Sequence, residues 1–244
     1  MKEKSQIALV TGGNKGIGFA TAKVLLSLGY FVYIGARDEE KGLVAVQQLN
    51  ALGFHNVSLL VIDVADIKSV KAAAELLSTQ IEKLDVLVNN AAIGGPQPQS
   101  ASAVDIAVLR DVYETNFFGV VQVTQAMLPL MQKSPAPRIV NVSSELGSLG
   151  YHSRDKSEYL ASNLMAYSTS KTAVNSFTLM LANEMQRTAF KINSVTPGFT
   201  ATDLTDHTGN RTPGEAAQII VKYATLGQDG PSGQFFGGAG RMPW

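Results

Sequence analysis

The chain has 244 residues, enough for one large domain or two small ones, and 45% of them are hydrophobic, which allows a sizeable core. Its 20 basic and 20 acidic side chains give a formal net charge of zero, which argues against a nucleic acid or a membrane surface as a partner. The absence of cysteine excludes disulfides, thiolate metal sites and thiol nucleophiles.

The chain starts with MKEKSQIALV, in which the apolar run is too short for the core of a signal peptide. No later run approaches the length of a membrane span. We therefore expect a soluble, cytoplasmic protein.

Short runs rich in Val, Ile and Leu recur along the chain without strict alternation, which is typical of parallel strands buried on both faces. These predicted strands cover residues 7–10, 31–36, 57–62, 85–90, 138–143 and 191–195, and a last candidate lies within 233–238. Helical segments separate them, and the alternation predicts an α/β fold: a single Rossmann-like doubly wound parallel sheet with helices on both faces. We expect residues 1–244 to form one dinucleotide-binding and catalytic domain.

The first two predicted helices have apolar side chains at helical spacing, which predicts the stripe that each turns to the sheet. In 18–28 the stripe consists of Ala20, Val24 and Leu28. In 39–52 it consists of Leu43, Val46 and Leu49.

A glycine-rich junction, ALVTGGNKGIG, joins the first strand to the first helix. In a doubly wound sheet, ligands bind where the carboxyl ends of strands meet helix N-termini. Gly12, Gly16 and Gly18 would let the backbone turn tightly and approach a pyrophosphate. The spacing G-x-x-x-G-x-G differs from the common G-x-G-x-x-G fingerprint, and any tight turn can use glycine, but three glycines at this junction favour a nucleotide site.

The end of the second strand bears on which nucleotide binds. An acidic residue usually stands there in NAD-binding sheets, whereas here Ala36 and Arg37 precede Asp38. A guanidinium suits a 2′-phosphate, and Lys15 could add a second positive charge, although a solvated surface lysine is the plainer interpretation of Lys15 alone. NADP(H) is therefore the preferred cofactor, with NAD(H) as the alternative if Asp38 approaches the ribose.

Five motifs follow one another in order, and these are TGGNKGIG, NNAA, NVSS, YSTSK and TPGFTATD. Together they resemble the classical short-chain dehydrogenase/reductase family over almost the whole chain. The first motif and TNFFGV are most similar to the NADPH-dependent carbonyl reductases of that family.

The resemblance implies that Ser144, Tyr167 and Lys171 are catalytic, together with Asn116, which would hold a water that links Lys171 to solvent. It also implies that Asn89 supports the strand beside the adenosine ribose. The residues expected at the cofactor are Thr11, Gly12, Asn14, Lys15, Gly16, Ile17, Gly18, Arg37, Asp63, Val64, Asn90, Ala91, Tyr167, Lys171, Pro197, Gly198, Thr200 and Thr202.

Each of these residues also has a purely structural interpretation. Ser144 could cap the loop after the fifth strand, Asn116 could cap or kink its helix, and Asp63 could cap a turn.

The sequence departs from the family pattern in two places. Ala92 stands where the family usually has the glycine of NNAG, a change that should only crowd a backbone turn. More residues than usual, 145–166, separate Ser144 from Tyr167. We expect this segment and 197–215 to shape substrate choice.

The pair of Tyr167 and Lys171 suits proton transfer to a carbonyl oxygen. Their i,i+4 spacing places both side chains on one helix face. A free tyrosine has a pKa of about 10, and the nearby Lys171 ammonium, together with the positive ring of the cofactor, is expected to lower the pKa of Tyr167. Ser144 can hold the carbonyl oxygen, and the pyridine nucleotide carries the hydride. The sequence therefore predicts an NADPH-dependent oxidoreductase that reduces a ketone or aldehyde to an alcohol.

Other functions fit less well. A Ser/His/Asp hydrolase would need G-x-S-x-G at a strand-to-helix turn, and the corresponding NVSSELG does not match that motif. A metalloenzyme also fits poorly, because no histidine–carboxylate spacing suggests a metal site. An epimerase-like relative usually adds a C-terminal substrate region, for which little chain remains after 233–238. A catalytically silent nucleotide sensor or scaffold of the same fold is the main alternative, although it would have no use for Ser144, Tyr167 and Lys171 together.

The predicted pocket wall is mostly apolar, which favours a small apolar or aromatic carbonyl or alcohol as the substrate. The residues expected in it are Leu146, Leu149, Tyr151, Phe199 and Leu204, with the C-terminal GRMPW as a further candidate. Val174, Phe177 and Met180 or Leu181 are too widely spread to face one sheet, so we also expect a homodimer or homotetramer.

Overall fold

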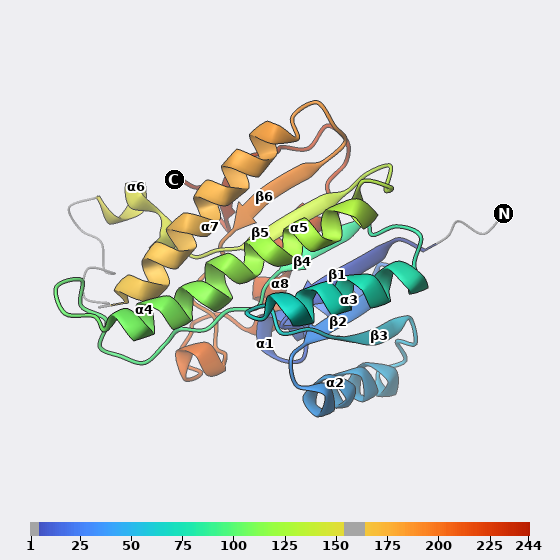
Figure 1. The fold of residues 1–244 in the computed structure, drawn as a ribbon, viewed down its shortest axis with the longest axis horizontal. Helices are drawn as coiled ribbons and strands as arrows, with labels where there is room; N and C mark the ends of the chain where they lie inside the picture. Colours follow the sequence, from blue (N-terminus) through green and yellow to red (C-terminus); the bar gives the residue numbers. More distant parts are fainter. Residues whose placement is uncertain (1–4, 154–163) are drawn as a thin grey trace.

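The computed structural model describes residues 5–153 and 164–244, and Figure 1 shows that the strands form one sheet between layers of helices. The eight strands lie in the order β3-β2-β1-β4-β5-β6-β7-β8. Their bounds are β1 Ile7–Thr11, β2 Phe31–Ala36, β3 Val57–Val61, β4 Val86–Asn89, β5 Arg138–Val142, β6 Lys191–Val195, β7 Gln234–Gly237 and β8 Gly240–Arg241. The first seven run parallel, and the two-residue β8 pairs antiparallel with β7.

Most α-helices connect successive parallel strands. They are α1 Gly16–Ser27, α2 Glu39–Ala51, α3 Ile67–Gln80, α4 Ile106–Tyr113, α5 Gly119–Met131, α6 Leu149–His152, α7 Met165–Glu184 and α8 Pro213–Ala224. The described residues also contain three short turns of other helix types: η1 Glu114–Phe118, η2 Glu145–Gly147 and η4 Asp203–Thr205. The predicted α/β class and the doubly wound parallel sheet are confirmed.

Each face of the sheet has its own hydrophobic core. On one face, β-strand side chains such as Val10 and Val88 pack against Leu25 of α1, Leu49 of α2 and Ile220 of α8. The opposite core joins the sheet to α3, α5 and α7, which lie in front of the sheet in Figure 1. Because the strands are covered on both faces, they carry the continuous apolar runs that the sequence displays.

The two predicted stripes coincide only in part with the buried helix faces: Leu49 is buried and Val24 and Val46 pack against the core, but Leu28 and Leu43 are exposed. In α1 the buried residues include Gly18, Ala22 and Leu25, while Leu28 is 56% exposed. In α2 they are Gly42, Ala45 and Leu49.

Close packing explains this difference, because the helices turn small residues to the sheet. A Cβ at Gly42 would lie 2.4 Å from Leu59 Cδ1, so a larger side chain does not fit there. The larger Leu43 therefore lies on the outer side of α2, 47% exposed.

None of the helices in the described part of the chain combines the length and apolar character needed to cross a membrane. The longest of those listed above is α7, which has 20 residues and carries YSTSK in its first two turns.

Candidate active site

A cavity of about 920 Å³ opens at the edge of the sheet where the parallel strands end. This volume lies within the range of about 300–1,000 Å³ that is usual for small-molecule sites. Its walls come from the segments that directly follow β1 through β6. The predicted site residues that line it are Gly12, Asn14, Lys15, Gly16, Ile17, Gly18, Arg37, Asp63, Val64, Asn90, Ala91, Ser144, Tyr167, Lys171, Pro197, Gly198, Thr200 and Thr202. Thr11 and Asn116 lie behind the wall, and the structure brings all the others together.

The glycine loop forms one end of the cavity and depends on the absence of side chains. Gly12 has φ +62°, and a Cβ at Gly18 would lie 2.3 Å from the carbonyl oxygen of Gly12. Helix α1 begins at Gly16, and its N-cap residue Lys15 makes no side-chain cap. The first N–H groups of α1 therefore suit a phosphate group, and the cradle fits a dinucleotide.

Thr11 is 1% exposed and acts on the loop from behind. Its hydroxyl oxygen accepts hydrogen bonds from the N–H groups of Asn90 and Ala91, at 2.9 and 3.1 Å. The Asn90 side chain donates back to the carbonyl oxygens of Thr11 and Gly12. These bonds join the ends of β1 and β4, so Thr11 supports the cofactor cradle without lining it.

At the end of β2, Arg37 lines the cavity, whereas the Asp38 side chain caps a helix. The Asp38 carboxylate caps α2 by accepting a 3.0 Å hydrogen bond from the N–H of Lys41, and it pairs with the Lys41 ammonium at 3.1 Å. These contacts lower the pKa of Asp38, the backbone hydrogen bond from Lys41 being the largest cause. Arg37 lines the cavity and Asp38 does not, which favours a phosphorylated ribose over a free one.

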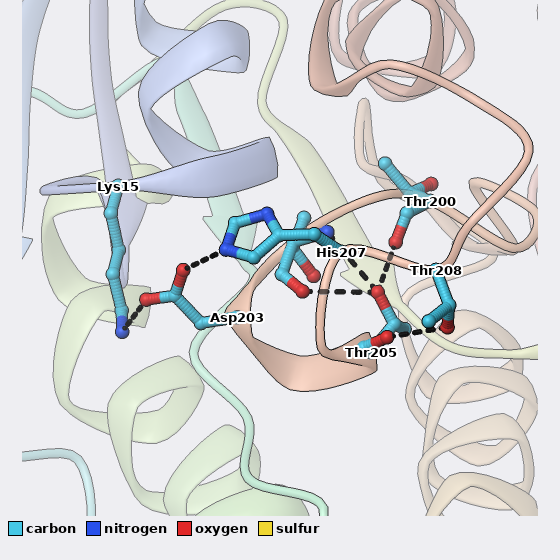
Figure 2. Close-up of polar contacts among 7 residues, drawn as sticks. Lys15, Thr200, Asp203, Thr205, His207 and Thr208 are labelled. Atoms are coloured by element: carbon cyan, nitrogen blue, oxygen red, sulfur yellow. Dashed lines mark hydrogen bonds and ion pairs between the residues drawn. The ribbon is translucent and has the colours of Figure 1, made fainter.

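Lys15 forms an ion pair with Asp203, and both residues line the cavity. Its ammonium lies 2.5 Å from the Asp203 carboxylate, whose other oxygen lies 3.1 Å from His207 Nε2 (Figure 2). The Lys15 hydrogen bond is the largest cause that lowers the pKa of Asp203. The surface-lysine interpretation is therefore incomplete, because Lys15 is exposed but links the glycine loop to η4.

The segment that carries Asp203 is held by a hydroxyl network (Figure 2). Thr205 Oγ1 donates to the carbonyl oxygen of Thr200 at 2.6 Å and accepts from the N–H of Thr202 at 3.1 Å. Thr208 Oγ1 donates to the carbonyl oxygen of Thr205. Asp206 and His207 have positive φ angles of 47° and 57°, unusual for residues with side chains. This turn directs His207 back to Asp203.

At the opposite end, Ser144 is both a cap and a neighbour of Tyr167. Its Oγ accepts a 3.2 Å hydrogen bond from the N–H of Leu146 and so caps η2. The same side chain makes a hydrogen bond that lowers the pKa of Tyr167. The capping interpretation is correct, and the hydroxyl also faces the phenol.

Tyr167 and Lys171 share one face of α7, as their spacing predicts. The Lys171 ammonium lies 5.7 Å from the centre of the Tyr167 ring and donates a 2.9 Å hydrogen bond to the carbonyl oxygen of Val142. Gly147 of η2 packs directly on Lys171, because a Cβ at Gly147 would lie 2.8 Å from Lys171 Cβ. The lysine is 3% exposed and fixed beside the phenol.

Burial dominates the ionisation of both groups. It raises the pKa of Tyr167 to about 12, against the smaller lowering by the Ser144 hydrogen bond. It lowers the pKa of Lys171 to about 8. In the protein alone, burial outweighs the Ser144 hydrogen bond and the pKa of Tyr167 is raised, while its lowering by Lys171 together with the cofactor's positive ring stays a prediction. The neutral phenol is the form that can donate a proton.

Asn116 occupies η1, a π-helical turn between α4 and α5, and is fully buried. Its Oδ1 accepts from the N–H of Ile93, and its Nδ2 donates to the carbonyl oxygen of Ile93 and to Ser170 Oγ. Ser170 is the neighbour of Lys171 in the chain. Asn116 thereby ties the segment after β4 to α7, and the implied water contact stays a prediction.

Asp63 caps a turn in its own segment of the chain. Its carboxylate accepts a 3.0 Å hydrogen bond from the N–H of Ala65, which is the turn-capping role that the sequence left open. Asp63 and Val64 both line the cavity next to the glycine loop. Their position is compatible with the adenine end of a dinucleotide.

The apolar wall is only partly the one expected. Leu146, Phe199 and Leu204 line the cavity, whereas Leu149, Tyr151 and residues 240–244 do not. The reason is that α6 packs outward against the C-terminal end: the N–H of Gly150 and the Ser148 hydroxyl donate to the carbonyl oxygens of Trp244 and Pro243. Part of the expected wall, 154–163, lies outside the described residues.

Sequence reasoning missed the polar side chains beneath the cavity floor. Asn89 Nδ2 donates to Asn141 Oδ1 at 2.8 Å, and Asn141 Nδ2 donates to Thr178 Oγ1 at the same distance. Thr178 Oγ1 in turn lies 2.8 Å from Ser194 Oγ. Polar residues at the ends of otherwise apolar strands were the available signal. The predicted support by Asn89 is thus a link between β4 and β5.

No group of three or more His, Asp or Glu residues within 5–153 and 164–244 is arranged to hold a metal ion. His152 contacts the carbonyl oxygen of Leu146, and His207 contacts Asp203, so each has a local structural partner.

Comparisons with known proteins agree with this arrangement. Residues 6–212 match the model of the short chain dehydrogenase family. The chain is 33% identical to salutaridine reductase of Papaver bracteatum, covering 96% of this chain and 94% of that protein. It is 32% identical to carbonyl reductase [NADPH] 1 of Mus musculus, covering the whole of both. The structure of an NADPH-bound carbonyl reductase from chicken fatty liver superimposes with a TM-score of 0.86 at 26% identity, over 99% of this chain and 100% of that one. The chain therefore belongs to the short chain dehydrogenase family and is an NAD(P)-dependent oxidoreductase.

Proposed function

We propose that this enzyme uses NADPH to reduce the carbonyl group of a small apolar or aromatic ketone or aldehyde to an alcohol. The observation that carries the proposal is the convergence of Ser144, Tyr167 and Lys171 on the wall of a cavity that also holds the glycine loop and Arg37. Relatives named as salutaridine reductase and carbonyl reductase [NADPH] support the same chemistry.

The preference for NADPH rests on Arg37. It follows β2 directly and lines the cavity, while Asp38 is occupied as the cap of α2. Lys15 could contribute a second positive charge once it leaves Asp203. Because a guanidinium stabilises a phosphate and does nothing specific for a ribose hydroxyl, NADPH should be used well ahead of NADH.

The protein's own groups would divide the chemical work. Bound NADPH supplies the hydride. The Ser144 hydroxyl donates a hydrogen bond to the substrate carbonyl oxygen and holds it beside the phenol. Tyr167, neutral because its pKa is raised, gives its proton to that oxygen. The Lys171 ammonium stabilises the negative charge that then develops on the phenol oxygen.

The substrate end of the cavity supports an apolar ligand. Leu146, Leu164, Phe199 and Leu204 line it, and Phe199 and Leu204 are 48% and 46% exposed. An apolar ligand that covers these side chains would be stabilised by about 25 cal/mol per Å² of apolar surface removed from water.

Association is a separate part of the proposal. Of the residues that suggested it, Val174 and Leu181 are buried and Phe177 packs against the core, whereas Met180 faces outward as the predicted spread requires. Met180, 59% exposed, and Phe118, 48% exposed, could still contact a second copy. We keep a homodimer or homotetramer in the cytoplasm as the prediction, and sedimentation as a monomer at micromolar concentration would overturn the association.

The proposal is tested by following oxidation of NADPH, and separately of NADH, against a panel of apolar ketones and aldehydes. Turnover with NADPH well above that with NADH supports it. Preference for NADH would keep the enzyme but move the ribose contact from Arg37 to Asp38. Nucleotide binding with no turnover of any substrate would favour a silent sensor or scaffold.

A further inference from the structure

Helix α7 begins without a cap from its own sequence. A helix leaves its first four N–H groups without partners inside the helix, and a Ser, Thr, Asp or Asn at the N-cap usually satisfies one of them. The N-cap of α7 is Leu164, which makes no side-chain cap. The helix that carries Tyr167 and Lys171 therefore needs partners from elsewhere.

Gln99, 65 or more residues earlier in the chain, supplies these partners. Its backbone carbonyl oxygen accepts a 3.0 Å hydrogen bond from the N–H of Met165, and its side-chain Oε1 accepts a 3.2 Å hydrogen bond from the N–H of Tyr167. Gln99 also forms a parallel β-bridge with Leu164. A residue outside the helix thus caps its first turn at the proposed proton donor.

The other half of the same amide shapes the cavity wall. Gln99 Nε2 donates to the carbonyl oxygens of Gly94 and Pro96, at 2.7 and 3.1 Å. Gly94, Gly95 and Gln97 line the cavity. The side chain is fully buried, and rotating the amide by half a turn would place its oxygen against two carbonyl oxygens and its NH₂ against an N–H. Its orientation is therefore fixed by three hydrogen bonds.

We propose that Gln99 is a positioning residue for Tyr167, fastening the start of α7 to the cavity wall formed by the segment after β4. The inference rests on the proposed function of Tyr167. A buried amide with all its bonds satisfied holds the backbone of Tyr167 to one place. Misplacement of a reacting group by about 1 Å can cost roughly 100-fold in rate.

The test compares Gln99→Met and Gln99→Glu with the parent. Methionine keeps the approximate length but removes all three side-chain hydrogen bonds. Glutamate can still accept from the N–H of Tyr167 but, when ionised, cannot donate to Gly94 and Pro96, and it adds a negative charge at the start of α7. The matched controls are Gln48→Met and Gln48→Glu, at an exposed position of α2.

We expect Gln99→Met to lower kcat roughly 10- to 100-fold. Its KM and its Kd for NADPH should stay within about twofold of the parent values, because the glycine loop is untouched. Gln99→Glu should move the kcat–pH profile to higher pH, because the added charge opposes formation of the phenolate. Both Gln48 variants should behave like the parent.

Hydrogen–deuterium exchange gives a readout that does not depend on turnover. The amide of Tyr167, which loses its side-chain acceptor, should exchange faster in Gln99→Met, with those of the later turns of α7 unchanged. Unchanged exchange at the Tyr167 amide, or a kcat within twofold of the parent, would overturn the inference. A parent without turnover would instead contradict the proposed function, while loss of cap protection in Gln99→Met would still support the anchoring.

Discussion

The Lys171 ammonium lies 5.7 Å from the centre of the Tyr167 ring, and a backbone carbonyl rather than a carboxylate holds it there. In the described part of the chain no acidic side chain pairs with it. Among the described residues no carboxylate neutralises its positive charge, which is therefore available to a phenolate. The arrangement is expensive for stability, since burial lowers the pKa of Lys171 to about 8.

Replacing Lys171 with methionine should therefore stabilise the protein at pH 7 while abolishing turnover. The pKa of Lys171 is lower in the native protein than in the unfolded chain, so keeping Lys171 charged at neutral pH lowers the stability of the native state. Stability therefore rises as the pH passes from about 8 towards 10.5, where the native protein loses this charge before the unfolded chain does. A pKa shift of this size corresponds to roughly 3 kcal/mol, from which about 1 kcal/mol is lost with the hydrogen bond to Val142.

Urea unfolding of the parent and Lys171→Met at pH 7 and pH 10 measures the effect. The variant should gain about 1–3 kcal/mol at pH 7, and the gain should shrink at pH 10. A variant that is less stable at pH 7, or a difference independent of pH, would contradict the account of burial.

Gly18→Ala should disrupt the glycine loop. The added Cβ would lie 2.3 Å from the carbonyl oxygen of Gly12, so the backbone must move at the place where we expect the pyrophosphate. We expect at least a tenfold weaker Kd for NADPH and a lower Tm. Gly227→Ala is the control, because an added Cβ there meets no atom within 4 Å. Equal behaviour of the two variants would disprove the close approach.

Arg37→Asp should move cofactor preference towards NADH. The change removes the guanidinium and places a carboxylate where it can accept hydrogen bonds from ribose hydroxyls. The ratio of kcat/KM for NADPH to that for NADH should fall about 10- to 100-fold. Arg187→Asp makes the same charge change at an exposed position away from the cavity lining and should leave the ratio unchanged. An unaltered ratio in Arg37→Asp would discredit the assignment of the 2′-phosphate site.

Asp203→Asn should strengthen NADP⁺ binding modestly. It releases Lys15 from a pair whose side chains are 65% and 57% exposed, and ion pairs exposed to this degree are weak. We expect a Kd up to about fivefold lower in dilute buffer, with the gain reduced by salt. His207→Asn leaves the Lys15 pair intact and should not strengthen binding. Weaker binding by Asp203→Asn would mean that the pair closes η4 over the cofactor.

The fold was largely predictable because the strands are recognisable in the sequence as short apolar runs, and segments with helical spacing separate them. The helix faces were not, because close packing selects small residues: Gly42 and Ala45 face the sheet and Leu43 does not. A prediction from apolar spacing favours large side chains, and it therefore grouped the exposed Leu28 and Leu43 with residues that pack against the core.

The site was predictable where chemistry and local spacing coincide, as in the pair of Tyr167 and Lys171. Contacts between distant segments could not be foreseen. Nothing in the sequence around Gln99 indicates that it caps α7, and nothing near Lys15 indicates Asp203. Burial raises the pKa of Tyr167, and the spacing of Tyr167 and Lys171 gives no sign of how deeply the phenol is buried.

The most direct test of the central claim is Tyr167→Phe, measured for NADPH-dependent turnover and for NADPH binding by fluorescence. The variant keeps the ring and removes only the hydroxyl that we propose as the proton donor. The account predicts that kcat falls at least 100-fold while the Kd for NADPH stays within about twofold of the parent value. A kcat within tenfold of the parent would show that another group supplies the proton.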